Sequence, residues 1–247
     1  SGGVEHAIRH RADRGVGRHT MEFDQYLKQG DTLHVAIVGN IMGSNTVPDV
    51  RNEVERLTVF QMLEGYQRLW DRHNAAWDKL WMSDIQVTGD AQAQQDIHSM
   101  LYHHYAFFRE GNAWSCSPMG LSGLGYNGLN FWDTETWMYP VLLVMQPQLA
   151  IEPLNYRFER LERAKQKAYF YGYKGALFPW ESGASGQEEV AVHNMYPNAE
   201  HHVTGDVAVA AWQYYCVTQD KDWLREKGYP LIAEPADFWV SRSEVDA

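Results

Sequence analysis

The sequence predicts a mainly α-helical protein that begins with a short β segment. Three observations carry this prediction. Residues 4–43 alternate or run apolar as strands do, the apolar spacing becomes helical from Asn52 onward, and long glycine- and aromatic-rich connections separate the helical stretches. Helical hairpins with elaborate loops at one end suit a toroid whose loops build a central pocket.

The β segment is predicted at Met21–Tyr26 and Leu33–Gly39, with a turn at residues 28–31 between them. Two or three strands that end near Gly39 and Gly43 cannot bury a face alone. They are therefore expected to belong to a larger sheet whose other strands lie outside this chain.

The helical segments are marked by apolar residues three and four positions apart. In Ala91–Arg109 such a stripe follows Asp90, a residue type that suits the N-cap. The same spacing predicts four more helical segments: Asn52–Trp81, Pro153–Tyr171, His201–Thr218 and about Leu231–Arg242. Two long connections, Gly111–Trp132 and Gly172–Glu200, have no helical pattern. Connections of that length are usually functional in compact domains.

Composition and charge exclude some function classes. The formal net charge is −11 and no run of Lys and Arg exists, so nucleic acid is not an expected partner. No apolar run is long enough to span a bilayer, so no membrane partner is expected either. The 10 Trp and 14 Tyr either line a cleft with half-buried rings or fill a large helical core. A neutral polar ligand is compatible with the charge.

Cysteine spacing and glycine motifs give little evidence for bound metals or cofactors. Cys116 and Cys216 fit no metal-ligand or C-x-x-C spacing and could pair only if the fold brings them together. The glycines of Gly120–Gly125 do not follow a convincing strand, so a dinucleotide site is not predicted, and no cofactor is expected. Ser1-Gly2-Gly3 before a strand-like segment suggests a chain joined in mid-fold. The absence of a signal peptide therefore leaves cytoplasmic and periplasmic or secreted locations open.

The first segment expected to carry chemistry contains Trp132 and Asp133, directly after the glycine-rich loop of residues 120–128. Glycines let a backbone approach a ligand closely. The Asp133 carboxylate can accept two sugar hydroxyls, while Trp132 can offer an apolar face to the C–H side of a pyranose. Alternatively, Asp133 or Thr134 caps the helix that starts here.

A second aromatic–acid pair, Trp180 and Glu181, lies in a loop that also contains Glu188. Taken alone, it is equally typical of a turn stiffened by Pro179, with the Trp packed inward and the acids solvated. Two Trp–acid pairs, each after a glycine-bearing loop, favour a shared carbohydrate pocket instead.

His201 and His202 precede the helix that contains Asp206. Adjacent residues on a helix point in different directions, and the i, i+4 pair of histidine ligands is absent, so no metal is predicted. A structural or substrate-binding histidine is the preferred interpretation. His103 and His104 are interpreted as surface and core filling.

Together these motifs resemble glycoside hydrolase family 65. The resemblance runs from about Asn52 to the C-terminus and is densest in five stretches: Trp81–Gly89, Pro118–Pro140, Tyr156-Arg157, Gly172–Glu188 and His202–Asp206. It implies a β-sandwich, a helical linker and an (α/α)6 barrel. Residues 1–48 would be the last strands of the sandwich, residues 49–88 the linker, and residues 89–247 the N-terminal part of the barrel.

The resemblance also implies residue roles. Trp132 and Asp133 would bind the glucosyl unit, and Asp133 would support catalysis by gripping hydroxyls as the ring flattens towards the transition state. Trp180, Glu181 and Glu188 would line the pocket towards the leaving sugar. His202 and Asp206 would shape the wall of the pocket.

The family's general acid is a Glu in a motif resembling GPDEYH, expected beyond residue 247, so this chain alone is expected to lack it. The implied reaction inverts the anomeric centre: the acid protonates the glycosidic oxygen while a nucleophile attacks from the opposite face. That nucleophile is water in hydrolases and phosphate in phosphorylases.

Two weak cues favour hydrolysis. Residues 178–182 resemble the branch with kojibiose hydrolases and the glucosidase for glucosylgalactosyl-hydroxylysine, and Leu129 resembles the acid trehalases. The predicted substrate is a disaccharide or glucosylated glycan with an α-glucosidic bond, preferably α-1,2 as in kojibiose or glucosylgalactose. A disaccharide phosphorylase releasing glucose 1-phosphate, a non-catalytic carbohydrate-binding module and a homo-oligomer stay open.

Overall fold

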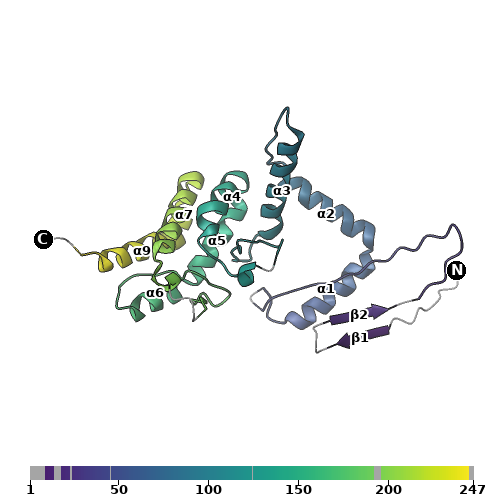
Figure 1. Cartoon of the computed structure of the whole chain (residues 1–247), viewed down its shortest axis with the longest axis horizontal. Helices are drawn as coiled ribbons and strands as arrows, with labels where there is room; N and C mark the ends of the chain where they lie inside the picture. The colour runs from purple at the N-terminus through teal and green to yellow at the C-terminus, as the bar shows by residue number, and fades with distance from the viewer. Residues whose placement is uncertain are drawn as a thin grey trace. The chain divides into compact units, whose positions relative to one another are not determined.

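The computed structural model describes residues 9–13, 18–22, 24–44, 46–123, 125–191 and 196–244. Within these ranges the chain is mainly helical, with one two-stranded sheet near its start, as the sequence predicted (Figure 1). The chain divides into two compact units, Ser1–Trp70 and Asp71–Ala247.

The sheet of the first unit pairs β1 (Arg9–Asp13) with β2 (Arg18–Glu22) in antiparallel register. The predicted strand Met21–Tyr26 is correct only for its first two residues, since β2 ends at Glu22 and residue 23 lies outside the described residues. The predicted turn is confirmed: the backbone N–H of Asp31 donates to the carbonyl of Lys28 at 3.0 Å.

The predicted strand Leu33–Gly39 is wrong. These residues have no regular structure, and Leu33, Val35 and Ile37 are 44%, 56% and 79% exposed. A strand is stabilised by pairing with a neighbour, and no residue that the structure describes pairs with this segment. Alternating apolar residues alone are therefore not sufficient to form a strand.

Two helices follow where the sequence predicted one continuous pattern. They are α1 (Val50–Glu64) and α2 (Tyr66–Leu80), separated by Gly65. Gly65 has a φ of +82°, a conformation that residues with a Cβ rarely adopt, so the helix is interrupted there. Asp49 caps α1 by accepting a hydrogen bond from the N–H of Asn52 at 3.1 Å.

The second unit begins its helical packing with α3 (Ala91–Phe107), and the predicted cap is confirmed because Asp90 accepts the N–H of Ala93 at 3.0 Å. The helices that follow α3 in this unit are η2 (Thr134–Met138), α4 (Tyr139–Met145), α5 (Pro147–Glu159), α6 (Leu161–Phe170), α7 (His202–Thr218), α8 (Lys221–Trp223), η4 (Leu224–Gly228) and α9 (Tyr229–Arg242).

The predictions for these later helices are confirmed in part. The pattern at Pro153–Tyr171 is two helices, α5 and α6, because Arg160 leaves the helical conformation with φ −109° and ψ 9°. The predictions for α7 and α9 are confirmed to within two residues. The long connections are also confirmed. In their described residues they contain two single turns, η1 (Gly125–Gly128) and η3 (Tyr196–Ala199), and an isolated β-bridge between Asn130 and Ser182. Residues 124 and 192–195 lie outside the described residues.

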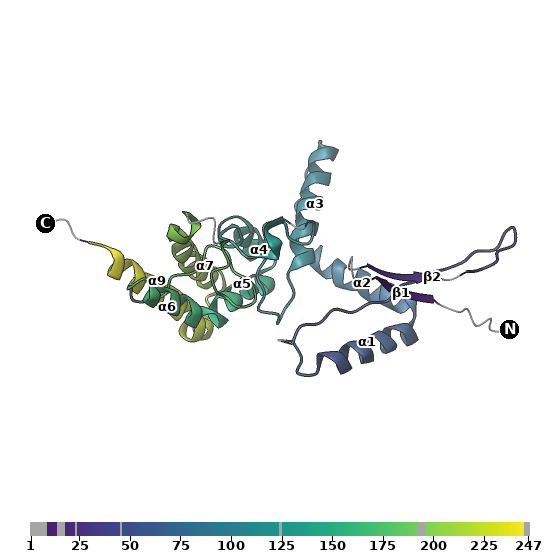
Figure 2. The same cartoon turned by 60° about the horizontal axis from the view of Figure 1, so that its bottom comes forward.

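The core of the second unit lies where α4, α5 and α7 pack against one another, and Figures 1 and 2 both show these helices side by side. The buried residues at its centre come from helical stripes: Tyr139, Leu142, Leu154, Val203, Val207 and Leu231. This packing brings the start of η2 and the start of α7 to the same part of the unit, since both helices contribute to one core.

Three further expectations concern thiols, membranes and aromatic residues. Cys116 is buried and Cys216 exposed, and both are free thiols. None of the described helices combines the length and the apolar character that a bilayer span needs. Trp223 is buried in the core, as one of the two interpretations expected, whereas Trp132 and Trp180 are only half-buried at the edge of the core.

Candidate active site

The two predicted aromatic–acid segments are joined backbone to backbone. The N–H of Asn130 donates to the carbonyl of Ser182 at 2.8 Å, and the N–H of Ser182 donates to the carbonyl of Asn130 at 3.0 Å. The hydroxyl of Tyr156, from α5, supports this bridge, since it lies 2.9 Å from Ser182 Oγ and 2.7 Å from the Gly183 carbonyl. The residues beside each bridge partner are thereby brought together.

Three of the predicted site residues form one aromatic cluster, which consists of Trp132, Trp180 and His202. The two indole rings lie 6.4 Å apart, centroid to centroid. The imidazole lies 4.9 Å from the Trp132 ring and 5.6 Å from the Trp180 ring, nearly perpendicular to both. The His202 side chain is 41% exposed, so the cluster is open to a ligand from solvent.

Asp133 stands at the first turn of η2, next to this cluster, and does not cap the helix. Its backbone is helical, with φ −53° and ψ −36°, and its side chain makes no capping hydrogen bond. Thr134 does not cap either, because its buried hydroxyl donates to the Cys116 carbonyl at 2.8 Å. The capping interpretation is therefore wrong. Within the described residues the Asp133 carboxylate has no hydrogen-bond or ion-pair partner, which leaves it available to a ligand.

A buried ion pair holds the segment on either side of Trp132 and Asp133. Arg157 contacts Glu135 through Nε at 2.6 Å and through Nη2 at 3.0 Å, and the two side chains are 1% and 0% exposed. Burial disfavours the charged guanidinium, but the Glu135 carboxylate outweighs this effect and raises the pKa of Arg157. Because the guanidinium makes two contacts with the carboxylate, the pair fixes the relative orientation of the two side chains and also neutralises their charges.

Asn130 completes this support from the other end of the segment. With its amide oxygen facing Arg157, it accepts a hydrogen bond from Nη2 at 2.7 Å, while its NH2 group donates to Thr134 Oγ1 and Ser115 Oγ. Sequence reasoning gave no role to Asn130, Glu135 or Arg157. The available signal was a charged residue, Arg157, on the apolar stripe of a predicted helix.

The acids of the second loop have different surroundings. Both oxygens of Glu188 are engaged: Oε1 accepts the N–H of Glu181 at 3.0 Å, and Oε2 accepts the N–H of Trp180 at 2.9 Å and Lys167 Nζ at 2.6 Å. The Glu181 carboxylate makes no hydrogen bond or ion pair with the described residues. Burial, and then the charges of Glu188 and Glu189, raise its pKa.

The adjacent histidines have separate tasks. His202 Nδ1 lies 2.8 Å from Asp206 Oδ2, so the proton sits on Nδ1 and Nε2 stays available as an acceptor when the ring is neutral. Arg242 Nε donates a hydrogen bond to His201 Nδ1 at 2.9 Å. Burial, followed by the Arg242 charge, lowers the pKa of His201. Among the residues that the structure describes, no three His, Cys, Asp or Glu side chains are grouped to hold a metal ion.

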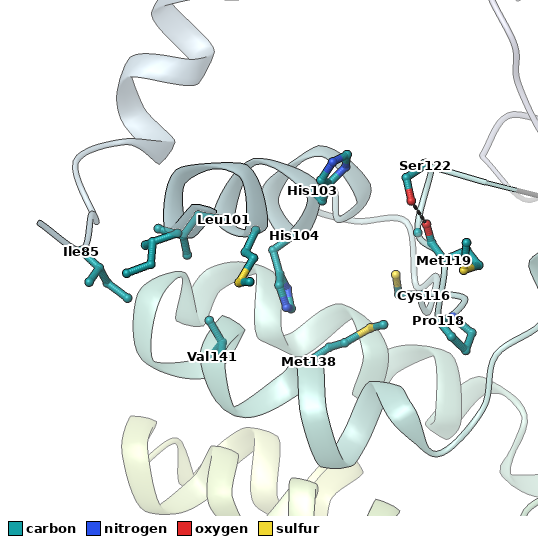
Figure 3. Close-up of a pocket in the computed structure, with 13 residues that line it drawn as sticks. Ile85, Leu101, His103, His104, Cys116, Pro118, Met119, Ser122, Met138 and Val141 are labelled. Carbon is teal, nitrogen blue, oxygen red and sulfur yellow. Dashed lines mark hydrogen bonds between the residues drawn. The ribbon is translucent and has the colours of Figure 1, made fainter. Parts of the chain in front are cut away.

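A separate cavity of about 480 Å³ lies beside the glycine-rich loop, between α3 and the helices that follow Asp133 (Figure 3). Met138 and Val141 point into it, and most of its lining is apolar. His104 also faces it, and burial lowers the pKa of this histidine. None of the predicted site residues lines this cavity, which offers few partners for sugar hydroxyls. The candidate site is therefore the aromatic cluster with Asp133 and Glu181.

Comparison with known proteins gives a consistent result. The family model described as the glycosyl hydrolase family 65 central catalytic domain matches residues 98–247. The chain is 55% identical over 226 residues to a kojibiose hydrolase from Flavobacterium johnsoniae, covering 92% of this chain and 33% of the relative. It is 33% identical over 246 residues to a kojibiose phosphorylase from Caldanaerobacter subterraneus, covering 93% of this chain and 32% of the relative.

A solved structure, the putative kojibiose phosphorylase from human microbiome, has the same fold over 82% of this chain and 29% of its own, with a TM-score of 0.71 at 21% identity. The chain thus spans about a third of the length of the curated relatives that it matches.

Proposed function

The chain belongs to glycosyl hydrolase family 65, and from this premise we propose that it carries part of the active site of an inverting α-glucosidase. The proposed reaction is hydrolysis of an α-glucoside, preferably an α-1,2-linked one such as kojibiose or glucosylgalactose, with release of glucose. The observation that carries the proposal is the Asn130–Ser182 bridge, which gathers Trp132 and Asp133 with Trp180 and Glu181.

The proposed architecture has three parts: the last strands of a β-sandwich at residues 1–48, a helical linker at residues 49–88, and the first part of an (α/α)6 barrel at residues 89–247. The packing of α4, α5, α7 and α9 supports the barrel, because these helices are neighbours around one core. The shared fold with the solved structure supports it further.

In this proposal Trp132 and Asp133 bind the glucosyl unit. Trp132 presents an apolar ring to the C–H face of the sugar, and the Asp133 carboxylate, which has no partner among the described residues, accepts sugar hydroxyls. Contacts to hydroxyls that strengthen as the ring becomes oxocarbenium-like lower the barrier rather than merely tightening binding. Trp180 and Glu181 line the side of the leaving sugar, near Glu188, and His202 and Asp206 shape the wall of the pocket.

An inverting reaction needs an acid on one side of the bond and a nucleophile on the other. The protonation of the glycosidic oxygen is assigned to the Glu that the family resemblance implies beyond residue 247. Asp133 is therefore a substrate-binding residue that supports catalysis, and neither Glu181 nor Glu188 is assigned the role of general acid. No cofactor takes part in the proposed reaction.

The alternative is a disaccharide phosphorylase that releases glucose 1-phosphate, and the 33% identity to a kojibiose phosphorylase over 246 residues favours it enough to require a test. Hydrolysis is preferred because the identity to a kojibiose hydrolase is 55%.

The test uses the full-length protein with kojibiose, trehalose and maltose, each with and without phosphate. Products are separated to distinguish glucose from glucose 1-phosphate, and the first anomer formed is followed by NMR. We expect β-glucose from kojibiose without phosphate. Product formation that requires phosphate would make the protein a phosphorylase. Binding of the sugars without any turnover would make it a carbohydrate-binding module.

A further inference from the structure

We infer that Lys167 and Glu188 form a positioning pair, which holds Trp180 and Glu181 in the orientation that receives the leaving sugar. Neither residue is assigned to the reaction itself; both act through the backbone that carries the binding side chains. The inference rests on the proposed function and adds to it the residues on which binding of the leaving sugar depends.

The Glu188 carboxylate bridges two consecutive backbone N–H groups. One oxygen accepts from Glu181 at 3.0 Å, and the other accepts from Trp180 at 2.9 Å. Lys167 approaches the second oxygen at 2.6 Å. The Lys167 and Glu188 side chains are only 11% and 16% exposed, so these charged hydrogen bonds are poorly screened and strong.

This arrangement leaves Glu188 poorly suited to bind a sugar directly. Three donors from the protein already surround its two oxygens, and a sugar hydroxyl would have to compete with them. Glu181 is the opposite case, because its carboxylate has no hydrogen-bond or ion-pair partner among the described residues. The two acids of this loop therefore divide the work: Glu188 holds the backbone, and Glu181 faces the ligand.

The pair is one of several attachments that fix the loop. Before the pair, the N–H of Leu177 donates to the carbonyl of Ala164 in α6 at 3.0 Å. After it, Ser182 is bridged to Asn130. Lys167 lies one helical turn beyond Ala164 on α6 and reaches the middle of the segment. Phe178 N–H also donates to Thr204 Oγ1 at 2.9 Å, and Glu189 N–H donates to the Glu181 carbonyl at 3.0 Å. Without the pair, the backbone N–H groups of Trp180 and Glu181 would lose the carboxylate that accepts from both.

Glu189 provides a matched control from the same loop. Its carboxylate accepts the N–H of Gly183 at 3.2 Å and the hydroxyl of Ser185 at 3.0 Å. It is exposed, however, and its carboxylate contacts neither Lys167 nor the N–H groups of Trp180 and Glu181. Glu189→Gln therefore changes the same charge in the same loop without disturbing the proposed pair.

The experiment compares kojibiose with p-nitrophenyl α-glucoside in the full-length protein, because the aryl glucoside lacks the leaving sugar. For Glu188→Gln and Lys167→Met we expect KM for kojibiose to rise by about tenfold or more, as for loss of a charged hydrogen bond. We expect kcat/KM for the aryl glucoside to change by less than about threefold. The double variant should be no worse than Glu188→Gln, because both residues act as one unit. Lys167→Arg should retain most of the kojibiose affinity, and Glu189→Gln should resemble the wild type.

The melting temperature of each variant separates positioning from simple stability. If the variants melt earlier but keep the wild-type KM for kojibiose, the pair is only structural and the inference is overturned. Equal losses of kcat/KM for kojibiose and for the aryl glucoside would overturn the inference as well, since the effect would then not depend on contacts with the leaving sugar. Should Glu188→Gln fail to fold, Lys167→Met carries the test, because it leaves the two backbone hydrogen bonds in place. A wild-type protein that releases no product from kojibiose would refute the proposed function itself. An active wild type whose variants are unaffected would refute only the positioning pair.

Discussion

Asn130 and Ser182 exchange two backbone hydrogen bonds, at 2.8 and 3.0 Å, and thereby join loops that are separated by α4, α5 and α6 in the chain. Isolated pairing of this kind is weak by itself. Here it is supported by Tyr156 on the Ser182 side and by the buried Arg157–Glu135 pair on the Asn130 side. The consequence is that the two Trp–acid pairs come close together, with the Trp132 and Trp180 rings 6.4 Å apart, centroid to centroid.

Asp133→Asn is expected to keep the fold of the full-length protein and lose at least about a hundredfold in kcat/KM for kojibiose. The carboxylate has no partner in the described structure, so the free energy of unfolding should be unchanged within about 0.5 kcal/mol. Kinetics and denaturant unfolding of the same preparation check both statements. Near-normal turnover would remove Asp133 from the site.

Arg157→Met is expected to destabilise the second unit by about 3–5 kcal/mol, because it leaves the Glu135 carboxylate buried without its counter-charge. The double variant Arg157→Met/Glu135→Leu should recover much of this loss, since no charge then remains buried. Urea unfolding of the 247-residue chain measures both changes.

Arg163→Met is the control for this prediction. Arg163 is exposed on α6 and contacts Gln166 at 3.0 Å, so its loss should cost less than about 0.5 kcal/mol. Equal stabilities of Arg157→Met and Arg163→Met would mean that the buried pair does not anchor the segment.

Gly175→Ala and Gly172→Ala separate steric from conformational effects, because both glycines have positive φ, +66° and +83°. A Cβ at residue 172 meets nothing within 4 Å, and its cost should be about 1 kcal/mol. A Cβ at residue 175 would lie 2.5 Å from the backbone nitrogen of Phe238 and closer still to the carbonyl oxygen of Glu234. It should therefore force α9 away and cost about 4 kcal/mol or more.

Thermal or urea unfolding of the two variants tests this pair of expectations. A similar cost for both substitutions would show that the contact between residue 175 and α9 is not tight in solution.

Glu181→Gln is expected to stabilise the protein at pH 7 and have no effect near pH 4. Burial first, and then Glu188 and Glu189, raise the pKa of Glu181 in the folded state. A group whose pKa is raised on folding contributes stability that is complete below the unfolded pKa, about 4.3 for Glu, and is lost as pH rises through the folded pKa. At pH 7 the wild type therefore carries a charged carboxylate whose ionised form is less stable in the folded state than in the unfolded state. The Gln variant carries no such charge.

Unfolding at the two pH values measures this difference, with Glu110→Gln as the control for an exposed acid in the same unit. A Glu181→Gln variant that is less stable than the wild type at pH 7 would mean that the carboxylate has a stabilising partner.

Local patterns in the sequence determined most of the helical structure. The stripe after Asp90 became α3 with its predicted cap, and the stripe from His201 became α7, because helix periodicity and capping depend on residues within a few positions of one another. The same reasoning detected Trp132–Asp133 and Trp180–Glu181 as pairs suited to sugars. The repetition of such a pair after a second glycine-bearing loop favoured a shared pocket, and the family resemblance implied that His202 lies on its wall.

Only the tertiary structure decided the matters that depend on distant residues. The alternation at Leu33–Gly39 predicted a strand, yet a strand needs a partner, and none of the described residues supplies one. Whether Asp133 caps a helix or remains open was undecided in the sequence because both uses need the same residue type at the same position.

The roles of Arg157 and Glu188 were likewise invisible, since each depends on contacts with residues from other parts of the chain. Periodicity reports on neighbours within one or two helical turns, whereas a site is assembled from loops that only packing brings together. The residue types of this site could thus be read from the sequence, and the contacts that orient them could not.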